Sequence, residues 1–368
     1  MFLVVGACAL PEPPAEPPPS LPSCTGELDA TFGDGGTVVA GDGEPLLEPL
    51  AAAVQADDKI VLAARPYLDG DELVVVRFLP DGRLDPSFGA GGIAAAPVGG
   101  GLNTVARAVA IDGGGNVLVA GTVGARAVVA RLTAAGALDG TFGIDGVALL
   151  AAGVPVAIAP AQAPADGIAV ALEHGRIARL DAKGTPDPAF GTGASVGDAG
   201  VRGYAVDARG RHLLLSSLRI TRLDAGGALD RAFGVRGRAI PSGIIAQPGG
   251  RAVIAEDQPA LLYALDDDGE DSSYGVGGTV WLPDGVAASA IVAAPDGAVT
   301  VAGDHHGHFV AARVSPAGAY ERCWATETAI GALRAIAIDS RRRVVLAGIT
   351  LAGDGTTAAR LALVRLAR

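Results

Sequence analysis

Residues 136–147 read GALDGTFGIDGV, a glycine-rich stretch that combines one phenylalanine with two aspartates. Such a loop could cradle a phosphate, hold a metal through Asp139 and Asp145, or form a turn that the fold uses repeatedly. A phosphate-binding loop needs a helix after it, and no helical pattern follows this stretch. Whether the stretch is unique in the chain decides between the other two interpretations.

The stretch is one of seven copies. The first residues of the copies are Gly26, Gly82, Gly136, Gly184, Gly227, Gly269 and Gly318, and the last copy is degenerate. Five copies carry an aspartate at the same position, namely Asp29, Asp85, Asp139, Asp187 and Asp230. All seven carry an aromatic residue, namely Phe32, Phe88, Phe142, Phe190, Phe233, Tyr274 and Trp324. These aromatic residues recur every 41 to 56 residues, a spacing typical of propeller blades.

Each copy sits inside a larger unit of four short apolar segments. An apolar strand follows the motif, as at residues 147–150, and a hairpin such as 104–121 comes next with glycines at its turn. A further strand, as at 127–133, leads into the next motif. Seven such units predict an all-β fold, a seven-bladed β-propeller of four-stranded antiparallel blades.

The two ends of the chain supply complementary parts of one blade. The chain opens with a motif and its trailing strand at 37–40, and it closes with the strand that should precede a motif, at 360–368. We therefore expect one blade to combine an N-terminal outer strand with three C-terminal strands. This pairing closes the ring and removes an exposed sheet edge.

A loop used seven times at one structural position is scaffold rather than active site. Its aspartate is expected to accept backbone N–H bonds in the turn, and its aromatic ring to lie between neighbouring blades. The glycine after the ring permits a positive φ.

The G-x-LD-x-x-FG-x-x-G pattern resembles the delta-60 repeat family, over nearly all of residues 25–368. The resemblance implies a β-propeller of exported or surface-attached bacterial proteins and brings no catalytic residues. The hairpins, such as residues 107–121, are also similar to NHL-type blades. That likeness implies that residues near 105–111, 202–207 and 332–338 form inner strands along a central channel.

The charge of the chain excludes several partners. Its net charge is −12, and only two residues are lysines. Nucleic-acid binding needs a basic surface, and so does docking on anionic lipid, so we expect neither. No motif for a cofactor or for catalysis occurs, and we expect no cofactor, no catalytic residue that the sequence can identify, and a monomer.

The N-terminal region resembles that of a bacterial lipoprotein. Residues 1–8 form a short signal-like segment that ends in Val-Gly-Ala-Cys, and the resemblance implies lipidation of Cys8. Residues 9–24 form a proline-rich linker that would hold the propeller, residues 25–368, off a surface. The expected location is the cell envelope, periplasmic or surface-exposed; an accidental match would mean a cytoplasmic protein.

The other two cysteines lie in motifs that a closed ring makes neighbours. Cys24 directly precedes the first motif and Cys323 lies inside the seventh. We hypothesise a Cys24–Cys323 disulfide that fastens the ring, with two free thiols as the alternative.

Two further clusters contain metal-binding residue types. His305, His306 and His308 fall at an expected blade turn, where neighbouring side chains point apart, so we favour a surface loop over a metal site. Residues Asp266–Asp271 contain five carboxylates but lack the spacing of a calcium loop, and we favour a solvated acidic turn over a calcium site.

The expected function is therefore a membrane-anchored, non-enzymatic scaffold that binds a protein or a glycan. The alternatives are an enzyme at the channel mouth, such as a polysaccharide hydrolase or lyase, and a purely structural surface or adhesion module. The residues that would reveal an enzyme are His174, His212, Arg202, Tyr204 and Arg334.

Overall fold

The computed structural model describes most of the chain from residue 24 onward. The described residues are 24, 26–41, 46–68, 70–160, 167–188, 190, 200–216, 219–233, 235–236, 241–248, 250–257, 260–283, 286–326, 330–350 and 359–368. The signal-like segment, the lipidation residue Cys8 and the linker up to residue 23 lie outside this set. Within it, no helix is long and apolar enough to cross a membrane.

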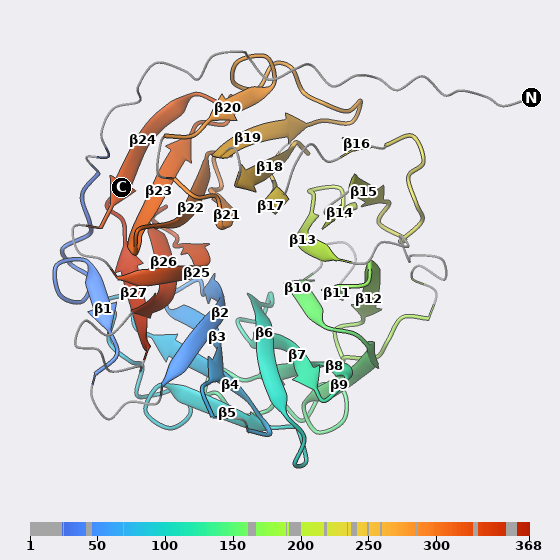
Figure 1. The fold of residues 1–368 in the computed structure, drawn as a ribbon. Coiled ribbons are helices and arrows are strands. Elements are labelled where there is room, and N and C mark those ends of the chain that lie inside the picture. The colour runs from blue at the N-terminus through green and yellow to red at the C-terminus, as the bar shows by residue number, and fades with distance from the viewer. Residues whose placement is uncertain are drawn as a thin grey trace, which may run out of the picture.

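Seven antiparallel sheets stand side by side in a ring, so the prediction of a seven-bladed β-propeller with four-stranded blades is confirmed (Figure 1). Blade 1 contains β2 (Leu47–Val54), β3 (Ile60–Pro66), β4 (Glu72–Phe78) and β5 (Ile93–Pro97). Blade 2 contains β6 (Thr104–Ile111), β7 (Val117–Val123), β8 (Arg126–Leu132) and β9 (Val147–Ala152). Blade 3 contains β10 (Pro155–Pro160), β11 (Ile168–Leu172) and β12 (Arg176–Leu180), and residues 191–199, where its outer strand is expected, lie outside the described residues.

The other four blades complete the ring. Blade 4 contains β13 (Val201–Val206), β14 (His212–Ser216), β15 (Arg219–Leu223) and β16 (Val235–Arg236). Blade 5 contains β17 (Pro241–Ala246), β18 (Ala252–Asp257), β19 (Ala260–Leu265) and β20 (Thr279–Trp281). Blade 6 contains β21 (Ala290–Ala293), β22 (Val299–His305), β23 (His308–Val314) and β24 (Tyr320–Ala325). Blade 7 contains β25 (Gly331–Ile338), β26 (Val344–Thr350), β27 (Arg360–Arg365) and β1 (Thr37–Val39).

The first strand of every blade lies nearest the central axis (Figure 1). The three predicted inner strands are β6, β13 and β25, each within one residue of the expected start. The second strand of a blade is instead covered on both faces by neighbouring blades, which is why β11, with the sequence IAVAL, is buried along its whole length.

Blade 7 joins the two ends of the chain, as expected. Strand β1 pairs antiparallel with β27, with Thr37 opposite Val364 and Val39 opposite Ala362. The pairing gives the last blade its fourth strand, so the edge of β27 is covered.

A disulfide joins Cys24 to Cys323, which are 299 residues apart in sequence and 4.7 Å apart between Cα atoms. In the closing blade the third strand is β27 and the fourth is β1, which come from opposite ends of the chain and so are not connected by a loop. The disulfide fastens the segment that leads into β1. Next to it, the backbone N–H of Gly26 donates to the Cys323 carbonyl at 2.9 Å. Blade 6 and the N-terminal segment are therefore joined by both a covalent and a hydrogen bond.

The core consists of seven apolar clusters, each shared by two neighbouring blades. Every cluster contains one motif aromatic: Phe32, Phe88, Phe142, Phe190, Phe233, Tyr274 or Trp324. Burying one such ring contributes about 2–3 kcal/mol. The motif therefore stabilises the contacts between blades.

Candidate functional site

The motif carboxylates are paired with arginines on the third strand of the same blade. In blade 1, Arg77 Nε donates to Asp85 at 2.8 Å, and both side chains are 3% exposed. The guanidinium also lies 4.3 Å from the centre of the Phe88 ring. Other blades repeat the ion pair as Arg131–Asp139, Arg179–Asp187, Arg222–Asp230 and Arg365–Asp29, and blade 6 substitutes Arg313–Glu321.

Five of these arginines also reach the next blade, namely Arg77, Arg131, Arg179, Arg222 and Arg365. Arg77 Nη1 donates to the Ala134 carbonyl at 2.8 Å, and Arg131 Nη1 donates to that of Ala182 at 2.8 Å. Burial alone would raise the pKa of Asp85, but hydrogen bonds from Ser87 and the nearby positive charges outweigh burial and lower that pKa to about 2. A carboxylate occupied in this way does not serve as a metal ligand, and the motif loop acts as a connector between blades.

The sequence analysis missed these arginines, although a signal was present. The arginine lies eight residues before the motif carboxylate, within the recurring strand ends VRF, ARL and TRL. Blade 5 has Tyr263 at that position, and Arg251 of the neighbouring strand end takes over by pairing with Asp271.

The acidic stretch Asp266–Asp271 is more than a solvated turn. Asp267 accepts hydrogen bonds from three arginines of blade 4, namely Arg209, Arg211 and Arg222. These positive partners lower the pKa of Asp267 to about 2, with the hydrogen bond from Arg211 the largest cause. The stretch therefore joins blades 4 and 5. A calcium ion needs free carboxylate oxygens as ligands, and the carboxylate of Asp267 is already bound to arginines.

The histidine cluster forms the two-residue turn between β22 and β23. His305 and His308 face each other across the hairpin, and His306 takes a positive φ of 50° at the turn. His308 Nδ1 donates to the Thr326 carbonyl at 2.7 Å. Among the described residues, no group of three or more histidine, cysteine or acidic side chains is placed to hold a metal.

Of the residues that would reveal an enzyme, Tyr204 and His212 are brought together, whereas Arg334 pairs with Glu48 between blades 7 and 1. Tyr204 and His212 are both buried in blade 4, where the tyrosine hydroxyl lies 2.6 Å from His212 Nδ1. The His212 ring also packs edge-on against Phe190, and burial lowers its pKa to about 4. His174 lies at an exposed turn 3.2 Å from Glu173, and Arg202 lies on β13, the same strand as Tyr204.

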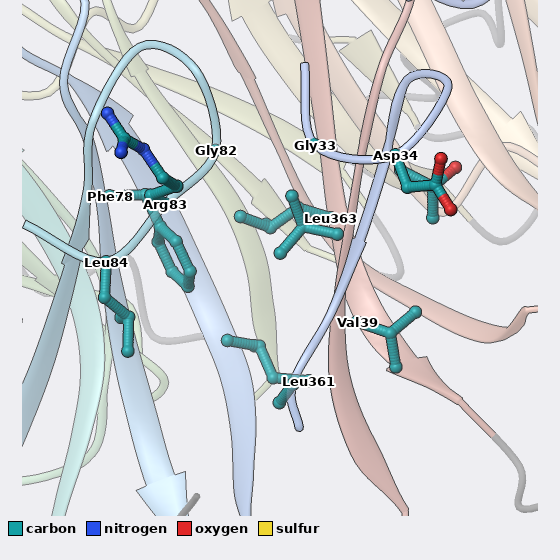
Figure 2. A pocket seen from close by; sticks show the side chains of 12 residues that line it. Gly33, Asp34, Val39, Phe78, Gly82, Arg83, Leu84, Leu361 and Leu363 are labelled. Atoms are coloured by element: carbon teal, nitrogen blue, oxygen red, sulfur yellow. The ribbon is translucent and has the colours of Figure 1, made fainter. Parts of the chain in front are cut away.

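A pocket of about 400 Å³ lies beside the short closing strand, between blades 7 and 1. Figure 2 shows Phe78 and Leu84 of blade 1 on one side and Leu361 and Leu363 of blade 7 facing them. The side chain of Val39 beside them is 46% exposed. The lining is mostly apolar, so the pocket suits an apolar group better than acid–base chemistry.

A charged cluster lies where the inner strands of blades 7 and 1 meet. Arg334 Nε donates to Glu48 Oε1 at 2.8 Å, and Arg65 donates to the other oxygen of Glu48. Burial works against the charged form of Glu48, but the hydrogen bonds and charges of the two arginines hold the pKa of its carboxyl below the ordinary value. Tyr67 lies within electrostatic range of the cluster and is 47% exposed. Two cations on one carboxylate leave this site with a positive charge in an acidic protein.

Comparison with known proteins supports the fold and gives no activity. A family model described as a domain of unknown function (DUF5122) beta-propeller matches residues 55–88. No curated protein matches the chain.

The chain is similar to several solved structures. One is the WD40 beta propeller domain of Doa1, at 11% identity and a TM-score of 0.62, over 92% of this chain and 97% of that one. Another is virginiamycin B lyase from Staphylococcus aureus, at 10% identity and a TM-score of 0.60, over 90% of this chain and 99% of that one. A streptogramin B lyase structure has 12% identity and a TM-score of 0.60, over 90% and 97%. At these identities the likeness shows a shared fold alone.

Proposed function

We propose that the protein is a non-enzymatic β-propeller that binds a protein or a glycan as a monomer at the cell envelope. A lipid on Cys8 anchors it there, and residues 9–24 separate the propeller from the membrane. In this proposal the delta-60 type repeats are the scaffold, and the ligand is bound by residues that the repeat does not use.

The observation that carries the non-enzymatic binding role is that the carboxylates and the histidine suited to catalysis are engaged in structural contacts. The motif carboxylates are bound to arginines between blades, as Asp85 is to Arg77. His212, one of the residues that would reveal an enzyme, is buried against Tyr204 and Phe190. Groups held in this way stabilise the ring, and they are withdrawn from proton transfer to a ligand.

The disulfide supports the proposed location. Structural disulfides persist in oxidising compartments such as the bacterial periplasm and cell surface. The Cys24–Cys323 bond joins the last residue of the linker, which is the first described residue, to the propeller. The bond therefore fastens the segment through which a lipid anchor would hold the domain.

The test for binding without turnover uses the oxidised protein on an array of glycans, followed by titration calorimetry of each ligand found. The same ligands are then incubated with the protein for a day, and the products are analysed by mass spectrometry. We expect saturable binding and unchanged ligand. Cleavage of the ligand would contradict the proposal and favour the channel-mouth hydrolase or lyase; no binding to glycans or envelope proteins would favour a purely structural module.

The anchor is tested in a bacterial host with labelled palmitate. We expect label on the wild-type chain, none on Cys8→Ala, and release of that variant from the membrane fraction. A wild-type chain that stays unlabelled in the cytosol contradicts the envelope location.

A further inference from the structure

The inner strands share a backbone irregularity that the repeat motif does not explain. Six of the seven inner strands have a register shift at one equivalent residue, which is left without a partner on the second strand. Such a bulge redirects the side chain of its extra residue. The residues at this position are Leu50, Arg107, Val156, Arg202, Ser242 and Arg334, and the corresponding residue of β21, which has no bulge, is Ser289.

The bulge arginines lie on the strands nearest the axis, and Arg334 there pairs with Glu48 of the neighbouring blade. Arg334 is exposed, while Leu333 and Ala335 on either side of it are buried. Arg202 is also exposed, and the half-buried Arg107 lies between two buried alanines. These strands are the innermost ones (Figure 1), so solvent reaches the side chains of Arg202 and Arg334 on the strands nearest the axis.

The three arginines are distributed around the channel. They belong to blades 2, 4 and 7. One blade lies between Arg107 and Arg202, two lie between Arg202 and Arg334, and one lies between Arg334 and Arg107. In a ring of seven blades these intervals correspond to about 100°, 150° and 100°. A ligand on the axis is therefore flanked by guanidinium groups on all sides.

The positive charges of Arg334 and Arg107 are only partly compensated. Arg334 shares Glu48 with Arg65, so one carboxylate serves two cations. Arg107 has no ion pair with any residue that the structure describes, and its buried Nε has no hydrogen-bond partner there. A buried donor without an acceptor is unfavourable, and a ligand that supplies an acceptor removes this cost.

We propose that the channel binds an oxyanion with several negative charges at the level of Arg107, Arg202 and Arg334. This inference deepens the proposed binding function, on which it rests, by naming the chemistry of the ligand. Guanidinium groups recognise carboxylate and phosphate oxygens through paired hydrogen bonds. The oxyanion is carried either by a free small acid or by an acidic sugar of a glycan.

The test is titration calorimetry of the oxidised full-length protein at low salt with citrate, pyrophosphate, trigalacturonate and neutral maltotriose. We expect saturable binding of the anionic probes, and about tenfold or greater loss in Arg107→Gln and in Arg202→Gln. Arg83→Gln is the matched control, because it removes the same charge from an exposed turn away from the inner strands. It should change the affinity less than twofold.

The outcomes distinguish an acidic glycan from a free acid as the ligand, and they distinguish failure of the oxyanion site from failure of the proposed function. Tighter binding of trigalacturonate than of citrate assigns the site to an acidic glycan, and the reverse order assigns it to a free acid. No saturable binding of any anionic probe at millimolar concentration, or equal losses in Arg83→Gln, overturns the oxyanion site. A glycan or protein that binds wild type and Arg107→Gln equally would leave the proposed function standing without this site. Circular dichroism melting of Arg202→Gln, whose side chain is exposed, checks that lost binding is not lost folding.

Discussion

Replacing Arg77 by methionine is expected to destabilise the whole ring, because this side chain joins blades 1 and 2. Its guanidinium donates to Asp85 at 2.8 Å and to the Ala134 carbonyl at 2.8 Å, and it covers the Phe88 ring. Methionine keeps the apolar stem and removes every one of these polar contacts. Removing one partner of a buried ion pair costs about 3–5 kcal/mol, since the other charge stays buried.

The lower end of that range applies here. Asp85 keeps the hydrogen bonds from Ser87, and Lys59 Nζ remains 3.6 Å from its carboxylate. We therefore expect Arg77→Met to lower the free energy of unfolding by about 3 kcal/mol. The double variant Arg77→Met with Asp85→Asn should lose less than the sum of the two single losses, because it leaves no unpaired charge.

The assay is urea unfolding at 25 °C, followed by circular dichroism on the oxidised protein. The matched control is Arg83→Met, which breaks the exposed Arg83–Asp81 pair at 2.9 Å in the same blade. An exposed pair contributes about 0–1 kcal/mol, so this control should change little. If Arg77→Met costs no more than Arg83→Met, the motif arginine is not a connector between blades.

A pH titration of the same variants gives a second readout. The pKa of Asp85 is about 2 in the folded protein against an ordinary value of 3.8. Its stabilising contribution is therefore present above pH 3.8 and is lost as the pH falls toward 2. Arg77→Met should show a smaller loss over that interval, whereas an unchanged loss would mean that Arg77 does not set this pKa.

Three other changes test the remaining contacts. Reduction of Cys24–Cys323, or Cys323→Ser, should lower the melting temperature, because the bond closes 299 residues and contributes about 2–5 kcal/mol; an unchanged melting temperature would refute this role. The pKa of His212 is about 4 in the folded protein against an ordinary value of 6.5, so the wild-type protein should lose stability as the pH falls from 6.5 to 4. His212→Asn should abolish this loss, and urea midpoints of the variant that match those of wild type across this range would contradict the prediction. Gly136→Ala should destabilise more than Gly115→Ala in the same measurement, because both have φ near 80° but only at Gly136 would the new Cβ lie 2.8 Å from the backbone nitrogen of Gly89 in the preceding motif; equal losses would leave backbone strain as the whole cause.

The fold could be read from the sequence because its determinants are local and repeated. The G-x-LD-x-x-FG turns bound short apolar segments whose alternation with turns specifies strands, and seven copies specify seven blades. The closing blade follows from the order of strands at the two ends, and it forms by the pairing of β1 with β27. Even the Cys24–Cys323 contact follows from counting motifs around a closed ring.

The contacts between blades were decided by tertiary structure. The carbonyl that Arg77 reaches is 57 residues further along the chain, and Asp267 meets arginines of another blade, so no local pattern reports these pairs. The channel site depends on the same geometry. Sequence placed Arg107, Arg202 and Arg334 on inner strands, but only the closure of the ring brings these strands around one axis, and only the structure shows the bulges at the three residues. Strand propensity acts over a few residues, whereas the approach of side chains from three blades depends on how seven sheets close into a ring.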